Sequence, residues 1–112
     1  MSARSHFQQD FPLGEIIASR QLLFTGKDGA EIPVRVLVGR PEAFPDSPGH
    51  YCPIQVIGLG SGRVKFAGGE DAVQALQLAL KRLSAEIRAL EKAANGLLRW
   101  LSEGDLDLAF PP

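Results

Sequence analysis

Apolar residues recur at helical spacing between residues 70 and 94, and this is the clearest pattern in the chain. At 100° per residue they fall within an arc of about 100°, the width of a core-facing stripe, while polar residues occupy the opposite arc. Gly69 is the expected N-cap, and Asn95 and Gly96 tolerate the left-handed backbone that ends a helix. We therefore predict one long amphipathic helix. Its stripe comprises Val73, Leu76, Leu80, Leu83, Ile87 and Leu90.

Alternation of apolar and polar residues predicts four strands before the helix, at residues 14–25, 31–39, 50–58 and 63–66. Glycine-rich turns at 25–29 and 59–62 join them as two hairpins. Pro33 cannot donate to a ladder, so its strand is expected at an edge or with that backbone position facing solvent. The expected inward side chains are Ile16, Ala18, Leu22, Phe24, Ile32, Val34, Val36, Val38, Cys52, Ile54, Val56, Val64 and Phe66, with Arg20 as an exception.

These elements predict an α+β fold: an antiparallel sheet of about four strands with the long helix across one face and a short C-terminal extended segment. Residues 1–12 are expected to form a flexible N-terminal tail and residues 13–112 a single domain. After the helix, the apolar run 97–101 and the alternating run 105–110 are each too short to stand alone. One or both should add to the sheet or run along the helix.

Composition narrows the class of protein. The chain has 112 residues, 45% apolar content and a net charge of −1, which fits one domain and leaves no broad positive field for nucleic acid. There is one cysteine, Cys52, and no apolar run approaches the roughly 20 residues needed to span a bilayer. We expect a cytoplasmic protein that binds neither nucleic acid nor membrane.

No pattern assembles a catalytic, metal-binding or cofactor-binding set. Cys52 faces inward and has no partner other than His50 at the strand entry, so a buried free thiol is the favoured interpretation. The glycine-rich residues 58–63 are followed by a strand, whereas a phosphate loop opens a helix. Asp105 and Asp107 share one face but lack further ligands for a hard cation. We therefore favour a non-enzymatic role without a cofactor.

The most informative predicted surface is the sheet face opposite the helix. Tyr51, Gln55, Arg63 and Lys65 should point outward there with Arg35, and tyrosine and arginine are enriched at binding hot spots. An ordinary solvated sheet face is the competing interpretation. In the proline-rich loop 40–49, Phe44 either anchors the loop on the core or contacts a partner.

A second, weaker stripe on the helix consists of small residues that would let another backbone approach. If a second copy packs on it, the homodimer interface comprises Ala75, Leu78, Ala85 and Ala89.

Two longer patterns carry a resemblance to a known family. Tyr51-Cys52-Pro53-x-Gln55 and Gly69-x-Asp71-x-x-Gln74-Ala-Leu-x-Leu-Ala resemble a family of small uncharacterised bacterial proteins defined as a domain of unknown function. Some similar small proteins look like immunity proteins of toxin systems. The resemblance transfers no catalytic residue. It implies structural roles for Gln55, Asp71 and Gln74, which we expect to bond loop and helix-start backbone groups.

Three functions remain open at this stage. The first is a protein-interaction module of the bacterial cytoplasm, for example an immunity protein that neutralises a toxin. The second is a small-molecule binding protein or minor enzyme with a pocket between helix and sheet lined by Tyr51, Cys52 and Trp100. The third is a homo-oligomeric structural protein.

Overall fold

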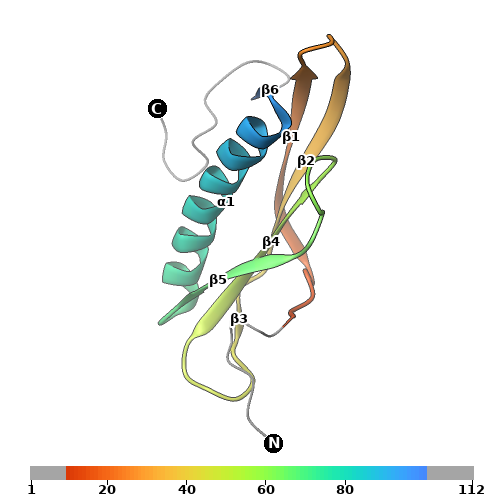
Figure 1. The fold of residues 1–112 in the computed structure, drawn as a ribbon. Helices are drawn as coiled ribbons and strands as arrows, with labels where there is room; N and C mark the ends of the chain where they lie inside the picture. The colour runs from red at the N-terminus through yellow and green to blue at the C-terminus, as the bar shows by residue number, and fades with distance from the viewer. Residues whose placement is uncertain (1–9, 101–112) are drawn as a thin grey trace, which may run out of the picture.

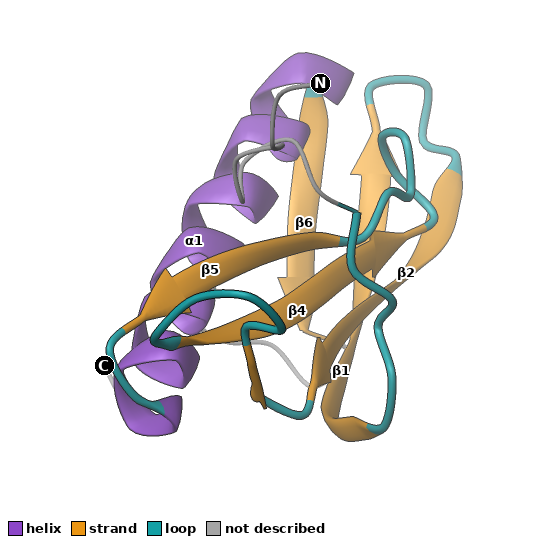
Figure 2. Cartoon of the chain, turned by 90° about the horizontal axis from the view of Figure 1, so that it is seen from below, coloured by secondary structure: helices purple, strands orange, loops and turns teal. Residues whose placement is uncertain are grey.

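Two hairpins, a long helix and two further short strands make up the part of the chain that the structure describes, residues 10–100 of a computed structural model (Figure 1). The helix packs on one face of an antiparallel sheet, which confirms the predicted α+β class (Figure 2). The elements are β1 (Ile16–Gly26), β2 (Glu31–Gly39), β3 (Glu42–Ala43), β4 (His50–Ile57), β5 (Lys65–Gly69), α1 (Ala72–Ala94) and β6 (Gly96–Trp100).

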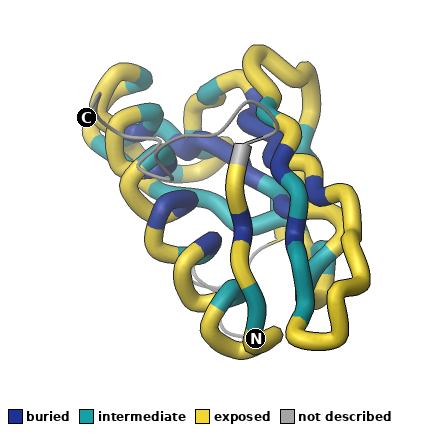
Figure 3. The backbone as a smooth tube through the Cα atoms, turned by 90° about the horizontal axis from the view of Figure 1, so that it is seen from above, coloured by how far each residue is buried: buried dark blue, intermediate teal, exposed yellow. Residues whose placement is uncertain are grey.

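Strand β4 is the branching point of the sheet. It pairs with β5 along one edge, and with β3 and β2 in succession along the other. Strand β1 follows β2, and β6 follows β1, so the two predicted hairpins β1–β2 and β4–β5 are confirmed and are joined through β2 and β4. The turn between β1 and β2, residues 27–30, is exposed (Figure 3).

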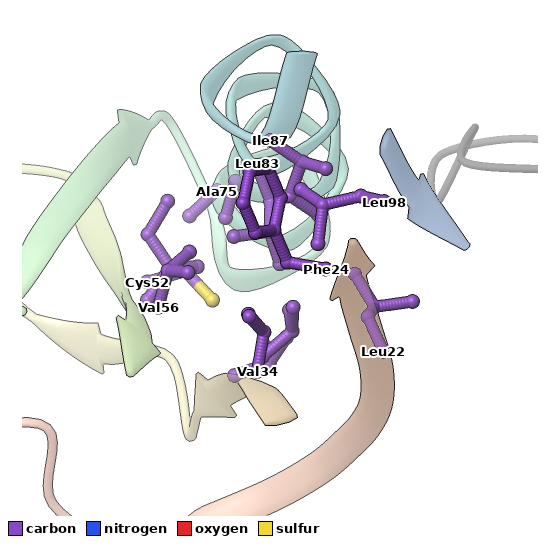
Figure 4. Packing of buried hydrophobic residues seen from close by; sticks show 13 residues of the cluster. Leu22, Phe24, Val34, Cys52, Val56, Ala75, Leu83, Ile87 and Leu98 are labelled. Carbon is purple, nitrogen blue, oxygen red and sulfur yellow. The ribbon is translucent and has the colours of Figure 1, made fainter. Parts of the chain in front are cut away.

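The core lies between α1 and the sheet face that it covers. Leu83 and Ile87 on α1 meet Phe24, Val34 and residues of β4 and β6 (Figure 4). Most of the predicted inward side chains of β2 and β4 are buried, whereas Ile16, Ala18 and Ile32 are exposed.

The buried face of α1 differs from the predicted stripe at its first turn. Val73 is 65% exposed, whereas Ala75 and Ala79 are fully buried. The cause is the tight corner before the helix, where a Cβ added to Gly69 would lie 2.5 Å from the Ala75 nitrogen. Backbones this close leave room only for small side chains. Ala75, which was expected in a homodimer stripe, is therefore a core residue, while Leu78, Ala85 and Ala89 are exposed.

Both helix ends are capped by side chains or backbone of the expected type, with one shift at the start. Asp71 is the N-cap in place of Gly69: its carboxylate accepts a hydrogen bond from Gln74 N–H at 2.8 Å. The Gln74 side chain in turn accepts from Glu70 N–H at 2.7 Å. At the other end Asn95 has the left-handed conformation, as predicted.

The helix also protects the two outermost strands. Arg82 donates to the Phe66 carbonyl of β5, and the Glu91 carboxylate accepts from Leu98 N–H of β6 at 2.7 Å. Unpaired strand edges otherwise invite pairing with other chains. The apolar run after the helix thus joins the sheet as β6, whereas the predicted extended segment 105–110 lies outside the described residues.

The orientation of β5 is opposite to the prediction. Lys65 pairs with Ile54 and faces the helix, where its ammonium group bonds the Glu86 carboxylate. Phe66 pairs with Pro53 and faces away from the helix. The loop 58–64 between β4 and β5 sets this register, and a shift of one residue in a loop moves every side chain of the following strand to the other face.

Candidate functional site

The face of the sheet opposite α1, the outer face, is divided into two halves. Residues 11–13, which we call the strap, cross the half formed by β4, β5 and the end of β2. The other half, formed by β1, β6 and the remaining parts of β2 and β4, carries exposed side chains. The two halves therefore offer different surfaces.

Three aromatic side chains surround the ring of Phe11 in the strap-covered half. Tyr51 stacks on it with ring centroids 4.0 Å apart and planes at 20°. Phe66 meets it edge-on at 5.0 Å and 89°, and Phe44 is tilted against it at 5.9 Å and 55°. We call Phe44, Tyr51 and Phe66 the aromatic box. Stacked and edge-to-face pairs at these separations stabilise each other beyond their buried area.

The box is built by local backbone features of three elements. Tyr51 lies opposite Gly68 in the β4–β5 ladder, and the absent side chain of Gly68 leaves space for Phe44. The loop that carries Phe44 is closed by its N–H, which donates to the Gly49 carbonyl at 3.1 Å. Gly49 has φ of 98°, which glycine adopts without strain.

The hydroxyl of Tyr51 carries no charge at physiological pH. Burial, with a smaller contribution from the Glu42 carboxylate, raises the pKa of its hydroxyl above 10.0. The phenol is therefore neutral at physiological pH, and its ring contributes to the box as an apolar surface.

The strap is held mainly by side-chain packing. Within residues 10–100, no backbone hydrogen bond joins residues 11–14 to the sheet, and the first one after them runs from Arg40 N–H to the Glu15 carbonyl at 2.8 Å. The Leu13 carbonyl passes directly over Gly39, where a side chain would collide with it. Phe11, which was expected in a flexible tail, is thus packed on the sheet.

The exposed half combines apolar and cationic side chains in cross-strand rows. Arg35 lies between Gln21 and Ile57, and Leu23 lies between Pro33 and Arg99. Ile57 is 39% exposed and Leu97 is 63% exposed. Glu31 adds one carboxylate at the margin. We call this set the binding face: Leu23, Pro33, Arg35, Ile57, Leu97 and Arg99.

The structure brings together only some of the predicted partner-binding residues. The rings of Phe44 and Tyr51 are in contact, with centroids 5.6 Å apart. Tyr51 is only 8% exposed, however, because Phe11 stacks on it. Arg63 is exposed in the loop after β4. Lys65 lies on the opposite face, paired with Glu86, so the predicted continuous basic and aromatic surface does not form.

Several residues of the outer face were not predicted as site residues. Leu23 was not among the side chains expected to point inward, and Arg99 lay in the apolar run 97–101, which had no assigned element. The signal that could identify them is the strand assignment of 96–100, because its pairing with β1 places Arg99 beside Leu23. Phe11 and Phe66 were missed because the tail and the orientation of β5 were misassigned.

The predicted ligand pocket is not formed by its predicted residues. Tyr51 lies on the outer face, Cys52 is buried in the core, and the side chain of Trp100 lies outside the described part. A groove of about 100 Å³ lies elsewhere, between α1 and strands β1 and β2. Its lining is Ala18, Ser19, Arg20, Val36, Val38, Leu80 and Leu83.

Cys52 has no property of a nucleophile. Its thiol is fully buried, lies 3.4 Å from the Gly39 carbonyl oxygen to which it donates, and has its pKa raised by burial to about 11. A thiol in this state is protonated at neutral pH. Among the described residues, no three His, Cys, Asp or Glu side chains gather in a way that would hold a metal ion. Within the part of the chain that the structure describes, no helix is both long enough and apolar enough to cross a membrane.

A protein-family comparison matches residues 18–112 to a Domain of unknown function (DUF6968). The chain belongs to the DUF6968 family. The match covers the helix, all strands except the first two residues of β1, and the three residues of the aromatic box, while Phe11 precedes it. Searches found no matching protein among curated sequences and no matching solved structure.

The motif residues of this DUF6968 chain have structural roles. The Gln55 side-chain amide donates to the Gly62 carbonyl at 2.8 Å and so braces the loop between β4 and β5. Asp71 and Gln74 bond the backbone at the helix start, as described above. The predicted roles for these three residues are confirmed.

Proposed function

We propose that this chain is a non-enzymatic protein-interaction module of the bacterial cytoplasm that binds its partner through the binding face. The single observation that carries the proposal is that Pro33 and Leu23 lie side by side on one sheet face between Arg35 and Arg99. Ile57 and Leu97 are exposed at opposite ends of the same face. Apolar side chains that are adjacent and exposed on a folded domain commonly mark interaction sites.

The chemistry of the face selects the kind of partner. Two guanidinium groups flank apolar side chains, and guanidinium groups make bidentate contacts with carboxylates. A complementary partner therefore presents an apolar centre with acidic residues around it. Four strands at about 4.8 Å spacing span roughly 14 Å, so the face supplies the centre of an interface whose rim extends beyond it. The resemblance to immunity-protein-like families makes a toxin the first partner to test.

The experiment is light scattering of the purified chain mixed with each product of its neighbouring genes. The expected result is a heteromeric species with the wild-type chain and at least about tenfold weaker binding for Arg35→Glu combined with Arg99→Glu. Arg88→Glu is the matched control, because Arg88 is an exposed arginine on α1. A complex that forms equally well with the double variant would refute the assignment of the face.

The groove between α1 and strands β1 and β2 supports a second candidate function, the binding of a small molecule. Its volume is about 100 Å³ and its lining is largely apolar. Thermal-shift screening with small metabolites tests this candidate, since a ligand that binds the folded state raises the unfolding midpoint. No shift at millimolar concentrations would exclude these ligands.

A further inference from the structure

The three rings of the aromatic box are in contact with one another as well as with Phe11. Their centroids are separated by 5.6 Å for Phe44 and Tyr51, 6.2 Å for Tyr51 and Phe66, and 6.3 Å for Phe44 and Phe66. Each ring is fixed by its own backbone, Tyr51 and Phe66 by the β4–β5 ladder and Phe44 by its closed loop. Removing Phe11 would therefore leave the walls in place.

The geometry of the box selects an aromatic ring as its occupant. Phe11 presents one face to Tyr51 and meets the ring of Phe66 at a right angle. Both arrangements satisfy the quadrupole of an aromatic ring, and an aliphatic side chain gains neither. Glu42, whose negative charge raises the pKa of Tyr51, further favours a neutral or cationic occupant over an acidic one.

The present occupant is attached in a way that permits exchange. Among residues 10–100, no backbone hydrogen bond ties residues 11–14 to the sheet. Gly14, with φ of 67°, precedes Glu15, whose carbonyl accepts from Arg40 N–H. The family match begins at residue 18, so it contains the walls of the box and not the ring that fills it.

We infer that the aromatic box is a binding site for one aromatic side chain of a partner peptide, and that Phe11 is its exchangeable resident. The ligand displaces the strap by pivoting it at Gly14 and takes the stacked position on Tyr51. This site is separate from the binding face, and its test requires no protein partner.

The test is a titration of the full chain with N-acetylphenylalanine amide, followed by NMR of labelled phenylalanine and tyrosine rings. The wild-type chain should bind weakly, because only the fraction with the strap displaced is competent. Phe11→Ala should bind at least about tenfold more tightly, with shifts at Phe44, Tyr51 and Phe66. Adding Phe66→Ala should remove that gain.

Two controls make the result specific. N-acetylleucine amide should bind Phe11→Ala at least about fivefold more weakly than the aromatic amide, since it lacks the ring contacts. Arg35→Glu with Arg99→Glu should leave the titration unchanged, which separates this site from the proposed binding face. If Phe11→Ala does not fold, Phe11→Leu serves instead. A folded variant that binds the aromatic amide no more tightly than wild type, or binds both amides equally, overturns the inference.

Discussion

The contact between the strap and Gly39 gives the sharpest stability prediction. A methyl group at position 39 would overlap the Leu13 carbonyl oxygen and lie 2.7 Å from Pro53 Cγ. Neither neighbour is the flexible end of a long side chain, so Gly39→Ala must displace either the strap or strand β2. We expect the strap to move, because strand β2 is paired on both sides.

The stability cost of Gly39→Ala can be worked out for either displacement, that of the strap or that of strand β2. Overpacking a well-packed site costs about 1–3 kcal/mol. Lifting the strap exposes the half-buried Phe11 ring and removes its aromatic pairs, which together contribute roughly 2 kcal/mol. Gly39→Ala should therefore lower the free energy of unfolding by about 2 kcal/mol, measured by denaturant titration with an unchanged m-value.

A double-mutant cycle identifies the cause. If the strap is what moves, Gly39→Ala should cost much less in a chain that already carries Phe11→Ala, because the strap contacts are lost only once. Gly62→Ala is the control: an added Cβ meets nothing within 4 Å there, and φ of 73° alone costs about 1 kcal/mol without coupling to Phe11. Additive costs of Gly39→Ala and Phe11→Ala would refute this reasoning.

Three further results are expected. Leu83→Ala should destabilise the fold by about 3 kcal/mol in denaturant titration, because Leu83 is a fully buried helix residue in the centre of the core. Asp71→Ala should cost about 1 kcal/mol by the same assay through loss of the N-cap, and Asp71→Ser should restore most of it. The raised pKa of Cys52 is a stability term that is fully present below about pH 9 and lost as pH rises towards about 11, so the unfolding free energy should fall across that window and Cys52→Ala should flatten the fall.

The sequence was most informative where a single pattern predicted both a secondary-structure element and the side of it that is buried. The alternation in β2 and β4 placed Val34, Val36 and Cys52 in the core because each strand is long and has one apolar side. The helix ends were readable because caps depend on local residue chemistry. The error of two residues at the start arose because Gly69 and Asp71 both suit an N-cap, and only the corner geometry distinguishes them.

The outer face was less predictable because it depends on register and on contacts between distant segments. Lys65 and Phe66 exchanged faces through a one-residue ambiguity in a glycine-rich loop. Pro33 suggested either an edge strand or a backbone position facing solvent. Strand β2 is central, and the proline lies beyond Arg35, where the pairing with β4 ends. The association of Phe11 with Tyr51, forty residues later in the chain, has no local sequence signal.

The most direct test of the proposed binding face is methyl NMR of the chain bound to its partner. We expect the methyl signals of Leu23, Ile57 and Leu97 to lose intensity on irradiation of the partner, while those of Val73 and Leu78 on the exposed side of α1 do not. Saturation transfer to Val73 and Leu78 that leaves Leu23, Ile57 and Leu97 unaffected would contradict the proposed binding face. It would place the interface on the helix.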